Sequence, residues 1–237
     1  GFATNGTFDL SAPGQLTGNI SANVVDVTAE GMDIGVSTPT LNVTTLGNPG
    51  LADATVTSMQ TDPMSFTASI SSNGTFDLTT DGTASGSVTA GGTTLITADD
   101  IDVDIDPVNI FDLTALSGNV NVTSDTPNAL TGTATATGTV NVNNFGSFVT
   151  TSPGLVGTDV TIRASDIIAE IQAETVDAET LSAVGNVDLT FDQFPPTTTQ
   201  VRAVAAGGAG DVTITTNRNL LLGSIQGDTV NIQGLTD

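Results

Sequence analysis

Residues 118–142 read "GNVNVTSDTPNALTGTATATGTVNV" and contain one short phrase twice, as Gly118–Val122 and again as Gly138–Val142. In both copies, valines alternate with small polar residues. Successive side chains of a β-strand point to opposite faces, so the alternation predicts a strand with one apolar and one polar face. Because a strand phrase returns in the same form so soon after its first copy, the stretch also indicates a repeated structural unit.

The phrase recurs through the second half of the chain. Further copies, each opened by glycine, are Gly157–Ile162, Gly185–Leu189, Gly210–Ile214 and Gly227–Ile232. In the first three copies the first apolar residues, Val120, Val140 and Val160, are equally spaced. This spacing suits a repeat protein in which each repeat forms one coil and stacks on the next. We therefore predict an all-β fold, a parallel β-helix (β-solenoid) with coils of roughly 18–20 residues, each holding two or three short strands.

The same spacing predicts which side chains form the core. Stacked coils would place equivalent residues above one another, so we expect one column of inward aliphatic side chains in three successive coils: Val120, Val122, Val140, Val142, Val160 and Ile162.

Tandem antiparallel β-sandwiches are the alternative fold, since they also consist of short alternating strands. The chain contains no Trp and no Tyr, so a sandwich would lack its usual aromatic core residues. The constant position of glycine before each strand phrase also favours the solenoid.

The first half of the chain keeps the alternation with variable spacing. The phrase "NGTFDL" occurs at Asn5–Leu10 and at Asn73–Leu78. We interpret it as an equivalent corner of stacked coils, with Asn-Gly in the turn and Phe and Leu in the core. The expected organisation is less regular coils in 1–117, regular coils in 118–237 that are continuous with the first part, and a loop at 192–200 around Pro195-Pro196.

Residues 165–184 are rich in Ala and Glu and allow two interpretations. The apolar residues Ile167, Ile168, Ile171 and Ala178 could form one face of a helix. The alternative, which we favour, is another coil with strands near Ile168–Ile171 and Thr180–Val184.

The composition restricts function. Twenty-six acidic residues face three scattered arginines, and the chain contains no Lys, His, Cys, Trp or Tyr. Binding to nucleic acid or to anionic lipid depends on clustered Lys and Arg, so neither partner is expected, and no apolar run is long enough for membrane insertion. Without His, Cys or Lys, general acid-base and nucleophilic chemistry lack their usual groups. We expect a protein that is not an enzyme, without a catalytic site and without a cofactor-binding site.

One acidic stretch suggests a metal site. In "ADDIDVDIDP" (98–107), Asp100, Asp102, Asp104 and Asp106 alternate with aliphatic residues, so a strand would carry four carboxylates on one face. Calcium prefers such oxygen ligands, which makes a calcium site the functional interpretation. A solvated outer face screened by salt is the alternative, and the metal-binding residues stay unknown at this point.

Residues 208–234, "GAGDVTITTNRNLLLGSIQGDTVNIQG", resemble the repeats of filamentous-haemagglutinin-like exoproteins. The resemblance covers about residues 118–234 and implies a right-handed parallel β-helix in the shaft of a bacterial surface adhesin. It implies a non-catalytic structural or adhesive role outside the cell or at its surface, with a host or matrix surface as a partner. From the solenoid itself we expect end-to-end contact with other copies of the chain or with flanking repeats, because the end coils of a solenoid present unpaired backbone groups unless they are capped. The alternative function is a calcium-dependent carbohydrate-binding module or a sandwich-type adhesin module.

Overall fold

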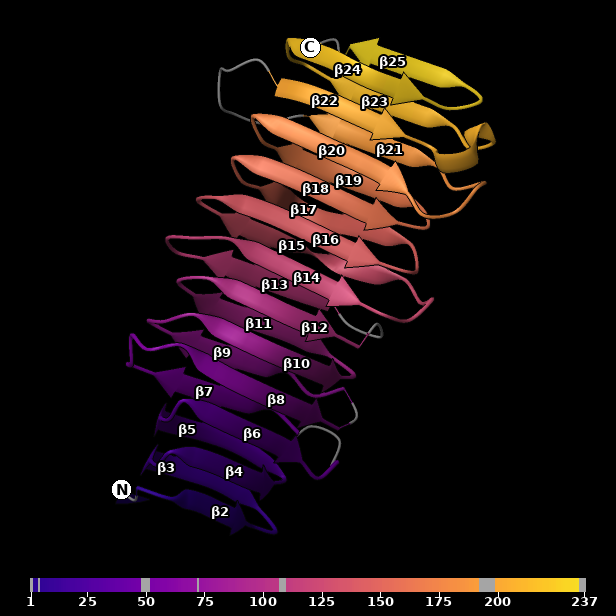
Figure 1. Cartoon of the computed structure of the whole chain (residues 1–237). Coiled ribbons are helices and arrows are strands. Elements are labelled where there is room, and N and C mark those ends of the chain that lie inside the picture. Colours follow the sequence, from indigo (N-terminus) through magenta and orange to yellow (C-terminus); the bar gives the residue numbers. More distant parts are fainter. Residues whose placement is uncertain are drawn as a thin grey trace. The chain divides into compact units, whose positions relative to one another are not determined.

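A computed structural model describes residues 2–3, 5–47, 52–71, 73–106, 110–191 and 199–234. The chain forms two compact units, Gly1–Ser117 and Gly118–Asp237, here the N-terminal and the C-terminal unit. In both units the strands alternate between two sheets, so that each coil contributes one strand to each sheet (Figure 1). Whether the two units form one continuous solenoid stays a prediction.

The N-terminal unit has an odd-numbered and an even-numbered sheet, each with its strands in sequence order. The odd-numbered sheet contains β1 (Phe2–Ala3), β3 (Gln15–Ser21), β5 (Gly31–Ser37), β7 (Ala54–Ser58), β9 (Phe76–Thr80), β11 (Thr93–Ala98) and β13 (Ile110–Ala115). The even-numbered sheet contains β2 (Thr7–Ser11), β4 (Val24–Ala29), β6 (Thr40–Thr45), β8 (Met64–Ile70), β10 (Ala84–Ala90) and β12 (Ile101–Ile105).

The C-terminal unit repeats this arrangement. Its even-numbered strands are β14 (Val120–Ser124), β16 (Thr139–Asn144), β18 (Asp159–Ala164), β20 (Thr175–Thr180), β22 (Thr199–Val204) and β24 (Leu220–Gln226). Its odd-numbered strands are β15 (Leu130–Ala136), β17 (Phe148–Val156), β19 (Ile167–Gln172), β21 (Val187–Phe191), β23 (Val212–Thr216) and β25 (Val230–Gly234). One 3-10 turn, η1 (Ala206–Gly208), connects β22 to β23.

The predicted β-solenoid is confirmed. Within each unit the described strand pairs are parallel and join a strand to the strand two positions later in the chain, which excludes antiparallel sandwiches. The repeat step expected from the strand phrase is present between β14 and β16, where Val120 lies opposite Val140. Other coils differ in length: the step from Asp159 to Thr175 is shorter, and the step from Thr175 to Gln200 is longer.

The inward column predicted from the sequence is present in the C-terminal unit. Val120, Val140 and Val160 lie opposite one another on successive strands, and so do Val122, Val142 and Ile162. All six side chains are at most 1% exposed. Stacking of identical or similar aliphatic side chains therefore continues from coil to coil and fills the space between the sheets.

The glycine that opens the strand phrase lies where coils approach closely at a corner. A Cβ on Gly210 would lie 2.0 Å from the carbonyl oxygen of Gly185, and a Cβ on Gly185 would lie 1.8 Å from the carbonyl oxygen of Ser165. Both contacts are with backbone, which cannot move aside without disturbing the stack. Glycine is therefore required by the close approach of one coil to the next.

The Asn or Asp at this corner, which follows Gly185, Gly210 or, in one coil, Ser165, satisfies the backbone of the next coil. The side-chain Oδ1 of Asp166 accepts the N–H of Asn186, and the Oδ1 of Asp211 accepts the N–H of Thr229. Between them, the Oδ1 of Asn186 accepts the N–H of Asp211. The ladder explains the recurrence of Asn or Asp at this corner, because their short side chains reach a neighbouring backbone N–H.

The interpretation of "NGTFDL" as equivalent corners was wrong. The first copy leads into β2 of the even-numbered sheet, whereas the second leads into β9 of the odd-numbered sheet. Because coil lengths vary, equal phrases far apart in the sequence need not return to the same sheet. The phrase does mark the start of a strand in both places. In the second copy Phe76 is fully buried and stacks on Phe66 of the opposite sheet, with ring centroids 5.6 Å apart.

Residues 165–184 form a coil, as favoured from the sequence. The first strand, β19, covers the expected Ile168–Ile171. The second strand, β20, ends at Thr180 rather than beginning there, because the alternation of buried residues runs through Val176, Ala178 and Thr180. In the predicted loop at 192–200, Thr199 and Gln200 already belong to β22, while 192–198 lie outside the described residues.

Candidate functional site

The predicted aspartate ladder lies on and beside β12 of the N-terminal unit. The aliphatic residues of this strand are buried, whereas Asp102, Asp104 and Asp106 are exposed. Asp100 is half-buried in the bend before the strand. On the neighbouring strand β10, Asp102 and Asp104 lie opposite hydroxyl residues, Ser85 and Ser87, rather than opposite further carboxylates. The predicted alternation is therefore confirmed, but β10 adds no acidic ligands to it.

Within the described ranges, no three or more His, Cys, Asp or Glu side chains form a group that could hold a metal ion. The ladder is thus an acidic outer face in this structure, and the calcium interpretation gains no ligand set from it. Among the residues that the structure describes, no helix is both long and apolar enough to span a membrane.

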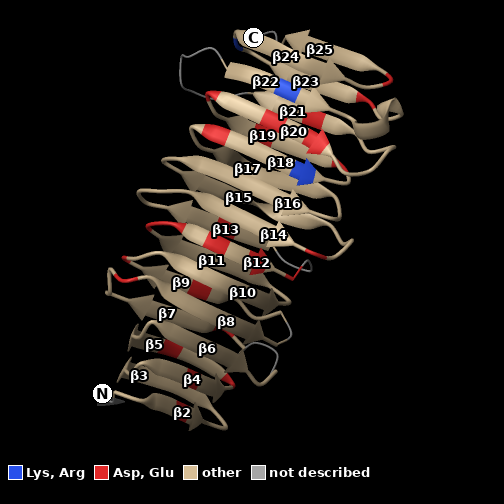
Figure 2. Cartoon of the chain, viewed as in Figure 1, with Lys and Arg blue, Asp and Glu red and all other residues tan. Residues whose placement is uncertain are grey.

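The sequence suggested three scattered arginines, but in the structure two of them, Arg163 and Arg202, lie close together. All three belong to the C-terminal unit, and Figure 2 shows no basic residue in the N-terminal unit. Arg163 of β18 and Arg202 of β22 lie on either side of β20, on the outer face of the even-numbered sheet. Between them, Asp177 and Glu179 project from β20, so that cations and anions from three successive coils meet.

The four side chains form a network of ion pairs. Asp177 accepts hydrogen bonds from Arg163 (Nη2 to Oδ2, 2.8 Å) and from Arg202 (Nη1 to Oδ1, 2.6 Å). Glu179 accepts a hydrogen bond from Arg202 (Nη2 to Oε2, 2.9 Å), and its Oε2 lies 3.8 Å from Nε of Arg163. Every charge therefore has at least one partner of opposite sign.

The network shifts the pKa values of Asp177 and Arg202. Partial burial by itself would raise the pKa of Asp177, but the hydrogen bonds and charges of Arg163 and Arg202 outweigh burial and hold that pKa below its ordinary value. The hydrogen bonds that Arg202 donates to Asp177 and Glu179 raise the pKa of its guanidinium. These ion pairs join β18, β20 and β22 and so tie three successive coils together.

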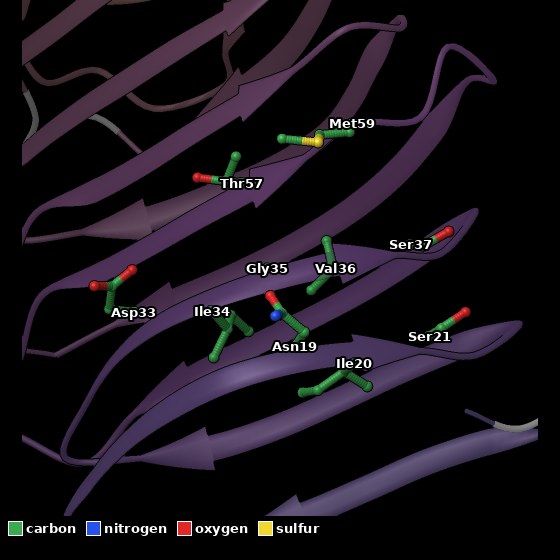
Figure 3. A pocket seen from close by; sticks show the side chains of 10 residues that line it. All are labelled: Asn19, Ile20, Ser21, Asp33, Ile34, Gly35, Val36, Ser37, Thr57 and Met59. Carbon is green, nitrogen blue, oxygen red and sulfur yellow. The ribbon is translucent and has the colours of Figure 1, made fainter. Parts of the chain in front are cut away.

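The best candidate for a binding site is an open hollow of about 630 Å³ on the outer face of the odd-numbered sheet in the N-terminal unit (Figure 3). It crosses β3, β5 and β7. Asn19, Gly35 and Thr57 lie opposite one another on these strands and form its central row. Asp33 and Ser37 flank Gly35 on β5, and Met59 in the turn after β7 lines the edge near Ser37.

Gly35 creates the hollow, because its position on the outer face carries no side chain. The side chain of Asn19 leans over it: a Cβ on Gly35 would lie 2.2 Å from the Oδ1 of Asn19. Neither Asn19 nor Asp33 makes a side-chain hydrogen bond within the described part of the chain, and both are exposed. The hollow thus offers an amide and a carboxylate that are free to bind a ligand, beside the hydroxyl of Thr57 and the thioether of Met59, which is 85% exposed.

Sequence reasoning missed this hollow, although a signal was present. In "MDIGVS" (32–37), a glycine takes an outward position of an alternating strand, where the neighbouring strands have side chains. Such a glycine weakens a strand and often marks a close approach of a ligand or another backbone. What the sequence could not show was that Asn19 and Thr57 flank it, because the steps between β3, β5 and β7 differ.

The terminal coil of the C-terminal unit, formed by β24 and β25, exposes its inward side. Val230 and Ile232 are each 44% exposed, whereas their partners one coil earlier, Val212 and Ile214, are fully buried. Leu222 of β24 is likewise exposed opposite the buried Val201. The inward face of β24 and β25 is therefore apolar and, among the described residues, only partly covered by the preceding coil.

The chain matches no protein-family model, no curated protein and no solved structure.

Proposed function

We propose that this chain is a non-catalytic structural and adhesive shaft outside the cell, a segment of a bacterial surface adhesin or matrix filament. The proposal draws on the β-solenoid fold and on the sequence resemblance of residues 118–234 to filamentous-haemagglutinin-like repeats. In a solenoid each coil contacts only its neighbours, so additional coils lengthen the structure without changing the coils already present. Such an architecture suits a spacer.

The observation that carries the proposal is the column of inward aliphatic side chains that continues from coil to coil in the C-terminal unit. Val230 and Ile232 point along the same column as the buried Val212 and Ile214, yet remain nearly half exposed. Burying an aliphatic side chain contributes roughly 1.5–3 kcal/mol, so a further parallel coil on β24 and β25 would be favourable. That coil would come from another copy of the chain or from flanking repeats.

The net charge of −23 opposes association between copies, and salt screens this repulsion. Electron microscopy and sedimentation of the chain at several concentrations and ionic strengths test the proposal. We expect rods that lengthen as salt is raised, and Val230→Asp with Ile232→Asp should return them to single particles. Particles that stay monomeric at high concentration and high salt would refute end-to-end stacking of copies.

A further inference from the structure

We propose that the hollow over Gly35 binds a neutral, hydroxyl-rich carbohydrate chain. The inference deepens the adhesive part of the proposed function and rests on it, since it names the ligand class that the shaft would hold. It uses the N-terminal unit alone and makes no use of end-to-end stacking.

The charge of the N-terminal unit restricts the ligand. The N-terminal unit contains acidic residues and no basic residue, and Asp33 lines the hollow itself. Phosphate, sulfate or uronate groups would be repelled, because no cation is available to pair with them. Nucleic acids and acidic polysaccharides are therefore excluded as ligands, and the ligand must be neutral or positively charged.

The backbone at the centre of the hollow disfavours an extended peptide as the ligand. Extended peptides usually bind a sheet by adding a strand to a free edge. Here β5 lies between β3 and β7, and β7 lies between β5 and β9, with parallel pairing on both sides. β3 pairs with β5 along its length, but with β1 only at Ile20 and Ser21. At the centre of the hollow, on β5 and β7, the backbone is thus engaged in the sheet and only side chains are available to a ligand, which removes the main source of affinity for a peptide there.

The side chains that line the hollow suit the hydroxyl groups of a sugar. The carboxamide of Asn19 and the hydroxyl of Thr57 can each donate and accept hydrogen bonds, and Asp33 accepts them. Sugar hydroxyls also donate and accept hydrogen bonds, so they can pair with all three side chains. A protonated amine only donates, so it can pair only with the acceptor oxygens of these side chains. The exposed thioether of Met59 is a flexible apolar group that can contact the C–H face of a sugar ring.

The shape of the hollow fits a polymer chain. The hollow is open and spans three strands, unlike the enclosed pockets that surround small ligands. An open trough of this kind fits an internal stretch of a polymer that continues beyond it at both ends. A carbohydrate chain satisfies the charge, the hydrogen-bonding groups and the shape together.

The test measures binding of the full chain to defined sugars. The probes are cellohexaose, chitohexaose and mannohexaose as neutral chains, with polygalacturonate as an anionic control and a lysine-rich peptide as a cationic control. Amide chemical shifts of the labelled chain report the site. We expect at least one neutral hexasaccharide to shift the amides of Asn19, Gly35 and Thr57, and polygalacturonate to leave them unchanged.

Two variants locate the interaction. Gly35→Val fills the hollow and should weaken binding by about tenfold or more, which corresponds to about 1.4 kcal/mol. Met59→Ala removes an exposed side chain, so folding is unaffected, and it should also weaken binding. Thr97→Val on β11, a polar outward position of the same sheet outside the hollow, is the matched control and should bind like the original chain.

The proposal fails if none of the three neutral chains shifts these amides, if Gly35→Val folds and binds as well as the original chain, or if only the lysine-rich peptide binds here. Rod formation is measured separately, on the same samples without sugar. Rods without sugar binding would overturn this inference and leave the proposed shaft intact, while sugar binding by a strict monomer would do the reverse.

Discussion

The side-chain Oδ1 of Asn186 accepts a hydrogen bond from the backbone N–H of Asp211, 2.9 Å away at the same corner of the next coil. Asp211 in turn accepts the N–H of Thr229 one coil further on. The corner is thus held by side chains that pair with the backbone where the sheet ladder is interrupted, which leaves fewer backbone donors unsatisfied.

Replacing Asn186 by alanine should therefore weaken this corner. The amide of Asp211 loses its acceptor, and we expect a loss of about 1 kcal/mol in the free energy of unfolding together with faster hydrogen exchange at that amide. Asn186→Asp keeps an oxygen acceptor, as Asp166 and Asp211 have, and should change both quantities little. Unchanged exchange in Asn186→Ala would show that the hydrogen bond contributes nothing.

A methyl group at Gly210 should destabilise the C-terminal unit. Its Cβ would meet the carbonyl oxygen of Gly185 at 2.0 Å, so the two coils would have to separate, and overpacking of this kind typically costs about 1–3 kcal/mol. Gly14→Ala is the control, because a Cβ at Gly14 meets no atom within 4 Å. Thermal melts compare the two variants. Equal melting temperatures would contradict the close approach of the coils.

The sequence revealed this fold because the same residues recur at the same corner. Glycine prevents a clash there and Asn or Asp accepts a backbone N–H, so both requirements leave a visible phrase in the C-terminal unit. The number of residues between corners is under no such constraint, since loops vary at little cost. The short step from Asp159 to Thr175 and the long step from Thr175 to Gln200 consequently hid the register.

Because coil lengths vary, the sequence does not reveal which residues lie opposite one another on neighbouring strands, and therefore which side chains form a site. Thr57, Thr79, Thr97 and Thr114 form one outward row on β7, β9, β11 and β13, yet their separations in the sequence differ. For the same reason, the contact of Arg163 and Arg202 with Asp177 was not expected from three dispersed arginines. Pairing between coils, rather than proximity in the sequence, brings these side chains together.

Val140 tests the stacked core directly. It lies between Val120 and Val160 and is fully buried, so Val140→Asp would bury a carboxylate without a partner and should cost several kcal/mol. Asn143→Asp on the outward side of the same strand, opposite Thr123 and Arg163, is the control and should not lower stability by more than about 0.5 kcal/mol. Urea unfolding measures both. A mild effect of Val140→Asp would mean that water reaches this column.

Asp177 should make the C-terminal unit sensitive to acid. Its pKa is lowered in the folded chain, so its contribution is present above the unfolded value of about 3.9 and is lost as the pH falls through the folded pKa. Asp177→Asn should therefore be less stable than the original chain at pH 7, by about 1 kcal/mol for a partly exposed network, and this difference should shrink below about pH 4. Asp125→Asn, at an exposed carboxylate without an ion pair among the described residues, is the control. A difference that does not depend on pH would contradict the role of the two arginines.

Removing either of two buried hydroxyl groups of the C-terminal unit should change its stability in opposite directions. The Oγ of Ser124 is buried and has no hydrogen-bond partner among the described residues, and the same holds for the Oδ1 of the adjacent Asn144. The hydroxyl of Thr180, by contrast, donates to the carbonyl oxygen of Ser182 and accepts the N–H of Ala206. An unsatisfied buried hydroxyl costs about 1–3 kcal/mol, so Ser124→Ala should leave stability unchanged or raise it, whereas Thr180→Val should lower it by about 1 kcal/mol or more. Calorimetry of both variants measures the contrast. If Ser124→Ala instead destabilises the chain as much as Thr180→Val does, the hydroxyl has a partner, which at a buried polar corner would be an ordered water shared with Asn144.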